Sequence, residues 1–460
     1  MPIDFRLRDH LHPVAVLRLR RTLERTQWMT RDELRAYQAQ RLRSVLGHAA
    51  RTVPHWRATF ASVGLDPRRI EDPSELAVLD VLAKERVREL GDALHAEDAR
   101  RLGAREESTS GSEGRPTRFL LDRRSRVLEF CHYWRHWSWA GYRLGDAFAE
   151  LGDHHFARRG PHGPRGSSGS ARRAASWCTP RACARTASRH CCASSSAACD
   201  SSRACPSALA QLADSVADAG EARHRFDAVF STGELLVPSV RARIERVLGG
   251  PVLDSYGHME RTVAVVECER GGRHAAQDYG LLETIDVRAE PGGTRVGRVV
   301  GTGLHGLAMP LVRYDVGDEI ELAPEGANCP CGRTLPLVGA VRGRVADVVR
   351  TPDGRAVGTL YTLVEERHGV RAFQFRQLAP DRVLLLVVPG PRFADAAAEE
   401  LRAAGHRRLG DGVRLDVVRA TEDDLERGPT GKVRPVVGLT PSSVDATAGA
   451  GAARATPAGT

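Results

Sequence analysis

The sequence predicts an α/β protein with two domains, and three observations lead to that prediction. Its 460 residues exceed what one compact core usually accommodates. Stretches with helical spacing alternate with short apolar strands, which is the pattern of α/β and α+β architectures. A new unit begins near VRGRVADVV (341–349). We therefore expect a large α/β domain over 1–342, a small mobile α+β domain over 343–437, and a disordered tail over 438–460.

The expected elements follow the chain in order. Residues 14–50 have helical spacing, 62–76 read as a loop with two Asp-Pro pairs, and 99–122 as strand, Gly/Ser/Thr loop and strand. Helices are expected over 125–146, 206–220 and 394–405, and residues 238–260 read as a helix followed by a strand. Strands are expected within 225–236, 296–303, 311–322, 373–377, 382–390 and 413–418.

The positive charge of the chain is concentrated in one stretch. The net charge is +9, but residues 157–205 alone hold nine arginines and a single acid, Asp200. No basic stripe with interleaved aromatic residues runs through the remainder, so nucleic-acid binding is not expected. The first thirty residues contain no apolar signal-peptide core, and no run is long enough to span a membrane. We expect a soluble, cytoplasmic protein, with a homodimer as one assembly to be considered.

The stretch 157–205 is anomalous in composition. It contains six of the ten cysteines and no Val, Ile, Leu, Met, Phe or Tyr, so it can bury little apolar surface. The cysteine spacings match no metal-ligand pattern. Such a composition arises when GC-rich codons are read in the wrong frame, and we interpret the stretch as the product of two compensating frame slips. A natural disordered insert is the alternative.

Five short motifs carry the chemistry, in a fixed order along the chain. They are STSGSEGRPT (108–117), STGE (231–234), DSYGHME (254–260), RYDVGD (313–318) with GRVAD (343–347), and PTGK (429–432). The first is a small-residue loop able to wrap phosphates with backbone N–H groups, although it is no Walker A loop. The last contains Lys432, one of only two lysines among 67 Lys and Arg residues. A lysine retained in so arginine-rich a chain indicates a need for one compact charge, unless it stands there by chance.

This ordered set resembles the adenylate-forming enzymes, which include acyl-CoA ligases, peptide-synthetase adenylation domains and luciferases. Over residues 35–156 and 205–437 the chain is most similar to the phenylacetate–CoA ligase and capsular polysaccharide biosynthesis branch. The resemblance implies an adenylate-forming N-terminal domain that joins a small carboxylic acid to ATP. It further implies attack of coenzyme A on the acyl-AMP, with Mg²⁺ as cofactor.

The resemblance also implies roles for individual residues. Glu260 would hold the Mg²⁺ that bridges phosphate oxygens, as a carboxylate commonly does. Tyr256, followed by Gly257, would pack on adenine, and Asp318, expected at a strand end, would bind the ribose. Arg344 would lie at the hinge and Lys432 would meet the reacting carboxylate. The β- and γ-phosphates would be held by Thr109, Ser110, Gly111, Ser112, Gly114 and Thr117.

Three positions depart from the family pattern, namely Glu113, Met259 and Ala346. Glu113 places a negative charge beside the expected triphosphate. An inactive nucleotide-binding relative therefore stands as one alternative, and the product of a frame-shifted gene that does not fold as another. His258 and His305 are interpreted as ordinary surface or core histidines.

A second constellation consists of thiols and an imidazole in ECERGGRH and CPCGR. Cys268, His274, Cys329 and Cys331 are the ligand types that a tetrahedral Zn²⁺ site uses. Four protein ligands leave no open position, so a structural zinc is expected rather than a catalytic one. Free loop thiols are the alternative.

Overall fold

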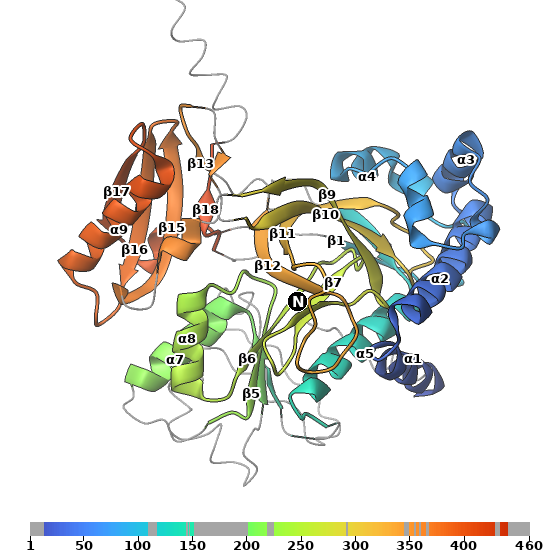
Figure 1. The fold of residues 1–460 in the computed structure, drawn as a ribbon, viewed down its shortest axis with the longest axis horizontal. Helices are drawn as coiled ribbons and strands as arrows, with labels where there is room; N and C mark the ends of the chain where they lie inside the picture. The colour runs from blue at the N-terminus through green and yellow to red at the C-terminus, as the bar shows by residue number, and fades with distance from the viewer. Residues whose placement is uncertain are drawn as a thin grey trace, which may run out of the picture. The chain divides into compact units, whose positions relative to one another are not determined.

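The chain divides into two compact units, which Figure 1 shows as ribbons. The computed structural model describes residues 13–108, 117–143, 146, 148–150, 201–218, 225–290, 293–344, 349–353, 356–357, 360–364, 368–427 and 433–439. Within these ranges the first unit holds residues 13–236 and 240–343, and the second holds 237–239 and 344–439.

The first unit begins with a group of helices. A capping box defines the start of α2, because Thr30 accepts from the backbone of Glu33 while the Glu33 side chain accepts from that of Thr30. Leu42, Leu46, Trp56 and Phe60 then enter a core shared with the strands. The helices are α1 (Pro13–Thr26), α2 (Arg31–Thr52), α3 (Pro54–Val63) and α4 (Lys84–Leu90), with 3-10 turns at Pro67–Arg69, Pro73–Val78 and Gly91–Leu94.

A ten-stranded open sheet forms the centre of the first unit, in the order β3-β4-β5-β6-β7-β8-β12-β11-β10-β9. Neighbours from β3 to β6 pair in parallel, and the pairs β6–β7, β7–β8, β8–β12, β11–β10 and β10–β9 are antiparallel. The strands are β3 (Phe148–Glu150), β4 (Ser201–Ala204), β5 (Ala228–Thr232), β6 (Val252–Gly257), β7 (Ala264–Glu267), β8 (Arg273–Ala275), β9 (Gly280–Ala289), β10 (Arg295–Gly303), β11 (Tyr314–Leu322) and β12 (Leu337–Arg344). A separate hairpin pairs β1 (Arg105–Ser108) with β2 (Arg118–Leu121).

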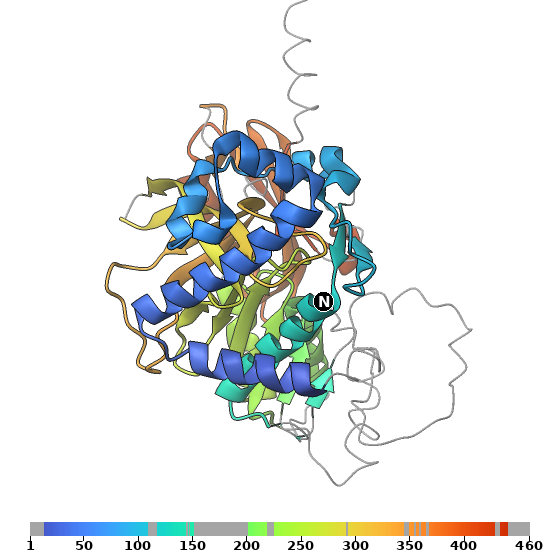
Figure 2. The same ribbon diagram turned by 90° about the vertical axis from the view of Figure 1, so that its right-hand side faces the viewer.

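Helices cover the parallel part of this sheet. All five residues of β5 are buried, as expected for a strand with both faces covered. α7 (Pro206–Asp218) and α8 (Pro238–Leu248) lie side by side against β5 and β6 in Figure 1, and Leu209, Ile244 and Val252 share one core. α5 (Arg123–Trp139) starts at Asp122, whose Oδ1 accepts from the Ser125 backbone. Figure 2 shows α1 alongside α5.

The second unit is a four-stranded sheet covered by one helix. The strand order is β17-β16-β15-β18, with β15–β16 antiparallel and β16–β17 and β15–β18 parallel. Leu401 and Leu409 of the helix pack on Val383, Leu385 and other strand residues. The elements are β13 (Val349–Arg350), β14 (Ala356–Val357), a 3-10 turn (Leu360–Leu363), β15 (Val370–Ala379), β16 (Arg382–Pro389), α9 (Asp395–Leu409), β17 (Arg414–Arg419), a 3-10 turn (Glu422–Asp424) and β18 (Val436–Val437).

The mixed α/β fold expected from the sequence is confirmed, with differences in detail. The helix expected over 125–146 ends at Trp139, where Gly141 takes a positive φ of 90°. The end of the anomalous stretch also differs from expectation, because Ser201–Ala204 forms β4 and Cys205 lies in the core beside α7. The rest of that stretch up to residue 200, and the tail from residue 440, lie outside the described residues.

Candidate functional site

Glu260 lies in a turn directly after β6 and is held by two side chains. The Tyr314 hydroxyl of β11 donates to Glu260 Oε1 over 2.9 Å, and His258 Nδ1 lies 3.1 Å from Oε2. The Glu260 side chain is only 6% exposed. A carboxylate accepts up to about four hydrogen bonds or metal contacts. Two contacts therefore leave acceptor capacity on both oxygens for a cation.

The surroundings of Glu260 favour its charged form. Burial by itself would raise the pKa of this carboxyl, but the hydrogen bond and charge of His258, together with the charge of Lys84, lower it to about 2. The same carboxylate and burial raise the pKa of the Tyr314 hydroxyl far above its usual value, burial being the larger cause. Glu260 is thus a preformed anion at neutral pH. His258, interpreted from the sequence as an ordinary histidine, is in fact its partner.

Two glycines of neighbouring strands make room for this turn. A Cβ on Gly280 would lie 1.9 Å from the Thr262 carbonyl oxygen, and one on Gly301 would lie 2.1 Å from Thr262 Oγ1. Thr262 Oγ1 is in turn 3.2 Å from His258 Nε2, so the Thr262 hydroxyl contacts the imidazole that holds Glu260. The missing side chains at Gly280 and Gly301 therefore allow the turn to rest on β9 and β10.

Tyr256 and Asp318 are brought together from distant strands. The Tyr256 hydroxyl donates to Asp318 Oδ2 over 2.7 Å. Gly257, beside Tyr256, is the last residue of β6. Asp318 was expected at a strand end, but it lies inside β11, directly after Gly317 with its positive φ of 80°. The pair offers a nucleoside the flat aromatic ring of Tyr256 and the acceptor oxygens of Asp318.

The other lysine of the chain also acts on this site. Leu82 joins the edge of β11, since its N–H donates to the Arg313 carbonyl and its own carbonyl accepts from the Asp315 N–H. This pairing places the start of α4, and with it half-buried Lys84, close enough to lower the pKa of Glu260. The sequence interpretation assigned no role to Lys84.

Only part of the expected phosphate and catalytic set can be placed. Thr117 is 1% exposed, and its hydroxyl accepts from Arg88 Nε of α4 over 2.9 Å. Arg344 is the last residue of β12. The residues outside the described ranges are Thr109, Ser110, Gly111, Ser112, Glu113, Gly114, Ala346 and Lys432.

The four thiol and imidazole residues converge in the first unit. His274 on β8 pairs with Val266 of β7 on one side and Leu337 of β12 on the other. The turn after β7 carries Cys268 and the turn before β12 carries Cys329 and Cys331. The pairing of β7, β8 and β12 therefore brings all four residues close together. Their ligand atoms lie within 4.8 Å of one another, with Cys268 Sγ 3.5 Å from Cys329 Sγ and Cys331 Sγ 3.3 Å from His274 Nε2.

His274 and Cys331 have the form that Zn²⁺ binds, whereas burial raises the pKa of the Cys268 thiol to about 12. His274 Nδ1 lies 3.0 Å from the Leu335 carbonyl and must donate to it, which leaves the Nε2 lone pair facing the thiols. Burial lowers the pKa of His274 and keeps it neutral. Burial would raise the pKa of the Cys331 thiol, but the N–H groups of Arg333 hold it below its ordinary value. Zn–S bonds of about 2.3 Å imply S···S edges of about 3.8 Å, close to the spacing observed.

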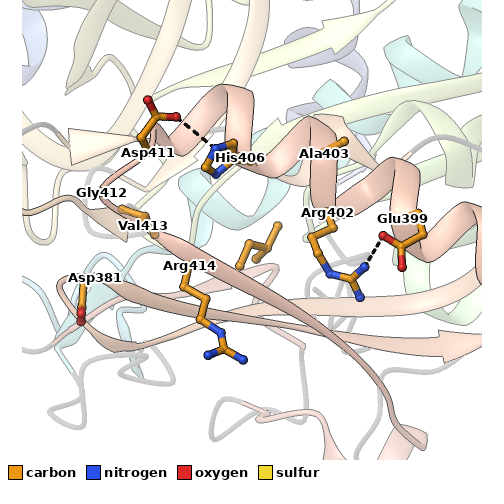
Figure 3. Close-up of a pocket in the computed structure, with 10 residues that line it drawn as sticks. Asp381, Glu399, Arg402, Ala403, His406, Asp411, Gly412, Val413 and Arg414 are labelled. Atoms are coloured by element: carbon orange, nitrogen blue, oxygen red, sulfur yellow. Dashed lines mark ion pairs between the residues drawn. The ribbon is translucent and has the colours of Figure 1, made fainter.

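A groove of about 610 Å³ lies in the second unit between α9 and the start of β17. Figure 3 shows two ion pairs within the groove: Glu399 with Arg402 at 2.5 Å, and Asp411 with His406 at 3.0 Å. None of the residues expected from the sequence lines it. We assign no function to this groove.

Several known proteins are similar to this chain in sequence or in fold. No protein-family model matches the chain. It is 26% identical to a phenylacetate–coenzyme A ligase of Thermus thermophilus over 70% of this chain and 72% of the relative. It is 28% identical to one from Pseudomonas putida over 73% and 75%.

Among solved structures, a 2-hydroxyisobutyryl-CoA ligase in a postadenylation state has a TM-score of 0.70 at 21% identity, covering 93% of this chain and 94% of that one. None of the described helices meets the length and apolarity needed to cross a bilayer. The predicted resemblance to the phenylacetate–CoA ligases is confirmed: the chain is similar to them over about 70% of its length, and it shares the fold of the 2-hydroxyisobutyryl-CoA ligase.

Proposed function

We propose that this chain activates a small carboxylic acid with ATP, releasing pyrophosphate, and transfers the acyl group from acyl-AMP to coenzyme A. One observation carries the proposal. Two side-chain hydrogen bonds join two separate motifs, one from Tyr256 to Asp318 and one from Tyr314 to the buried, anionic Glu260. The curated relatives named above are ligases that use coenzyme A.

The roles follow from the chemistry of each group. Glu260 is ionised and has free acceptor capacity, so it would hold Mg²⁺ bound to the phosphates. Asp318 would accept from ribose hydroxyls, and the Tyr256 ring would pack on adenine. Thr117, Arg344 and Lys432, with the small-residue loop 109–114, would hold and polarise the phosphates. Mg²⁺ neutralises charge on the phosphates when it is bound.

The test is the complete reaction with the purified chain. ATP, Mg²⁺, coenzyme A and a panel of aryl and short aliphatic acids are supplied, and AMP and acyl-CoA are measured by chromatography and mass spectrometry. We expect both products in equal amounts for at least one acid. A chain that binds ATP but forms neither product with any acid would be an inactive nucleotide-binding relative, the alternative that Glu113 in the phosphate loop favours.

A frame-shifted gene product is tested at the level of DNA. Resequencing the codons for residues 150–210 and reading the shifted frames should yield a segment with ordinary Leu, Val and Phe content. Stop codons or equally biased sequence in both shifted frames would contradict the frame-slip interpretation.

We further propose that Cys268, His274, Cys329 and Cys331 hold one structural Zn²⁺. The convergence of four ligand atoms and the fixed tautomer of His274 support this. Metal analysis of the freshly purified, folded chain should give about one Zn²⁺ per chain. Absence of zinc in that preparation would leave the cluster as free thiols. A capsular polysaccharide role, a cytoplasmic location and a homodimer stay predictions from the sequence.

A further inference from the structure

A small cavity with both polar and apolar lining residues lies beside Glu260 and Arg261. Leu128, Arg261, Tyr279 and His305 are among its lining residues. The space open to the centre of a water-sized sphere is about 20 Å³. A cavity needs about 10–15 Å³ on this measure to hold one water molecule, so there is room for one and not for several.

Arg261 brings hydrogen-bond donors without acceptors to this cavity. Its Nε and Nη1 are buried and have no hydrogen-bond partner in the part of the chain that the structure describes. The nearest carboxylate oxygen, Glu129 Oε2, lies 3.8 Å from Nε, beyond hydrogen-bond distance, and already accepts from the Tyr279 hydroxyl. Arg261 also has a positive φ of 55°, which costs a non-glycine residue conformational energy.

His305 brings an acceptor without a donor to the same cavity. Its Nε2 lies 2.9 Å from the Asp278 carbonyl, and since a carbonyl only accepts, Nε2 carries the hydrogen. Burial, followed by the charges of Arg41 and Arg124, lowers the pKa of His305 to about 3, so the ring carries one hydrogen only. Nδ1 is therefore a lone pair, and it too is buried without a partner among the described residues.

We propose that this cavity is a binding site for one structural water molecule, which accepts from Arg261 and donates to His305. Buried polar atoms are nearly always hydrogen-bonded, to protein or to ordered water. Only a molecule that accepts on one side and donates on the other satisfies both residues. An anion is disfavoured by the Nδ1 lone pair and by the carboxylates of Glu129 and Glu260, and a cation is disfavoured by the Arg261 guanidinium.

This water would fix the guanidinium of the residue that follows Glu260 in the chain. It would thereby support the strained backbone at Arg261 and hold the turn that presents the Glu260 carboxylate. The inference does not depend on the proposed function, because no nucleotide or acid takes part in it.

Electron density at high resolution tests the site directly in the full chain. We expect one ordered peak within about 3.2 Å of both His305 Nδ1 and either Nε or Nη1 of Arg261. A cavity without density, or Arg261 rotated into direct hydrogen bonds with Glu129, would overturn the proposal.

A double-mutant cycle provides a second test in solution. Arg261→Met and His305→Phe each remove one side of the bridge, so each should lower the urea midpoint of unfolding. The double variant should lose less than the sum of the two losses, because the water is already lost in either single variant. The control combines His305→Phe with Arg288→Met. Arg288 forms an ion pair with Glu319 on the exposed surface, so the losses of these two variants should add. Additive losses for Arg261 and His305 would overturn the bridge.

Discussion

Tyr256 of β6 donates a hydrogen bond of 2.7 Å to Asp318 of β11, although β7, β8 and β12 lie between these two strands in the sheet. In a flat sheet, strands four positions apart would be about 19 Å from each other. The contact therefore requires the sheet to curve strongly, and the antiparallel half turns back toward β6. This curvature brings two motifs, about sixty residues apart in the chain, to one place.

Removing the Tyr256 hydroxyl tests that contact. Tyr256→Phe keeps the ring but leaves Asp318 without this donor, so its carboxylate is less well positioned for ribose. We expect ATP affinity to fall roughly 3- to 10-fold, the equivalent of about 1 kcal/mol. Isothermal titration calorimetry measures the ATP affinity of both proteins. Tyr361→Phe in the second unit serves as control and should bind as the wild type does.

The position of the Glu260 turn against β10 depends on Gly301. Gly301→Ala places a methyl group 2.1 Å from Thr262 Oγ1, so Thr262 and the His258–Glu260 pair must shift. We expect destabilisation of about 1–3 kcal/mol by overpacking, with weaker binding of Mg–ATP. Gly303→Ala is the matched control on the same strand, because its added Cβ meets nothing closer than 3.9 Å. Equal unfolding midpoints for the two variants in urea would show that the close approach is not important.

The low pKa of Glu260 gives stability a defined pH dependence. Its pKa is about 2 in the folded chain against an ordinary 4.5, so the folded state favours the ionised form. The resulting stabilisation, up to about 3 kcal/mol, is fully present above pH 4.5 and is lost as the pH falls toward 2. Urea unfolding of the wild type and Glu260→Gln should therefore differ most near neutral pH and converge on acidification. A constant difference across pH 3–7 would contradict this.

Zinc binding can be disturbed without touching a ligand. A Cβ on Gly272 would lie 2.5 Å from Cys329 Sγ and 3.3 Å from His274 Nε2, within the space between the ligands. Gly272→Ala should therefore lose zinc and lower the melting temperature, as Cys329→Ser should. Trp139, whose ring lies edge-on to that of His274 at 5.7 Å, should change its fluorescence with metal loss. Gly412→Ala, whose added Cβ would meet nothing closer than 3.9 Å, should retain zinc.

Much of the fold and part of the site could be predicted from the sequence. The helices over 206–218 and 395–409 and the strand at 382–389 have clear periodicity, and the structure confirms them. β7, β8 and α4 were missed, because four, three and seven residues are too short for a periodic pattern to stand out.

The partners of Glu260 were also beyond the reach of the sequence. His258 lies two residues away and has no distinguishing spacing. Tyr314 lies on β11, four positions from β6 in the sheet, and Lys84 reaches the site through the pairing of Leu82 with β11. The glycines at 280 and 301 were a readable signal in retrospect, since a glycine inside a strand often marks a close approach of another segment. The cluster of Cys268, His274, Cys329 and Cys331 was predictable because such ligand types are few and distinctive.

The prediction for Lys432 follows from the family resemblance and is supported by the rarity of lysine in this chain. In adenylation, negative charge builds on the leaving pyrophosphate, and a cation positioned there stabilises the transition state. Lys432→Ala should lower the rate of acyl-AMP formation about 100- to 1000-fold. Lys432→Arg should also fail, because the planar fork does not replace one compact charge. Thioester formation from supplied acyl-AMP should change far less in both variants.

The proposed function rests on the claim that the chain forms acyl-adenylates, and ATP–pyrophosphate exchange measures that step alone. Labelled pyrophosphate is incubated with ATP, Mg²⁺ and the wild-type chain, with and without each acid of the panel. We predict incorporation of label into ATP that requires both Mg²⁺ and one of the acids, and that is lost in Glu260→Gln. Exchange that is absent with every acid, in a chain that is folded and binds ATP, would contradict the claim.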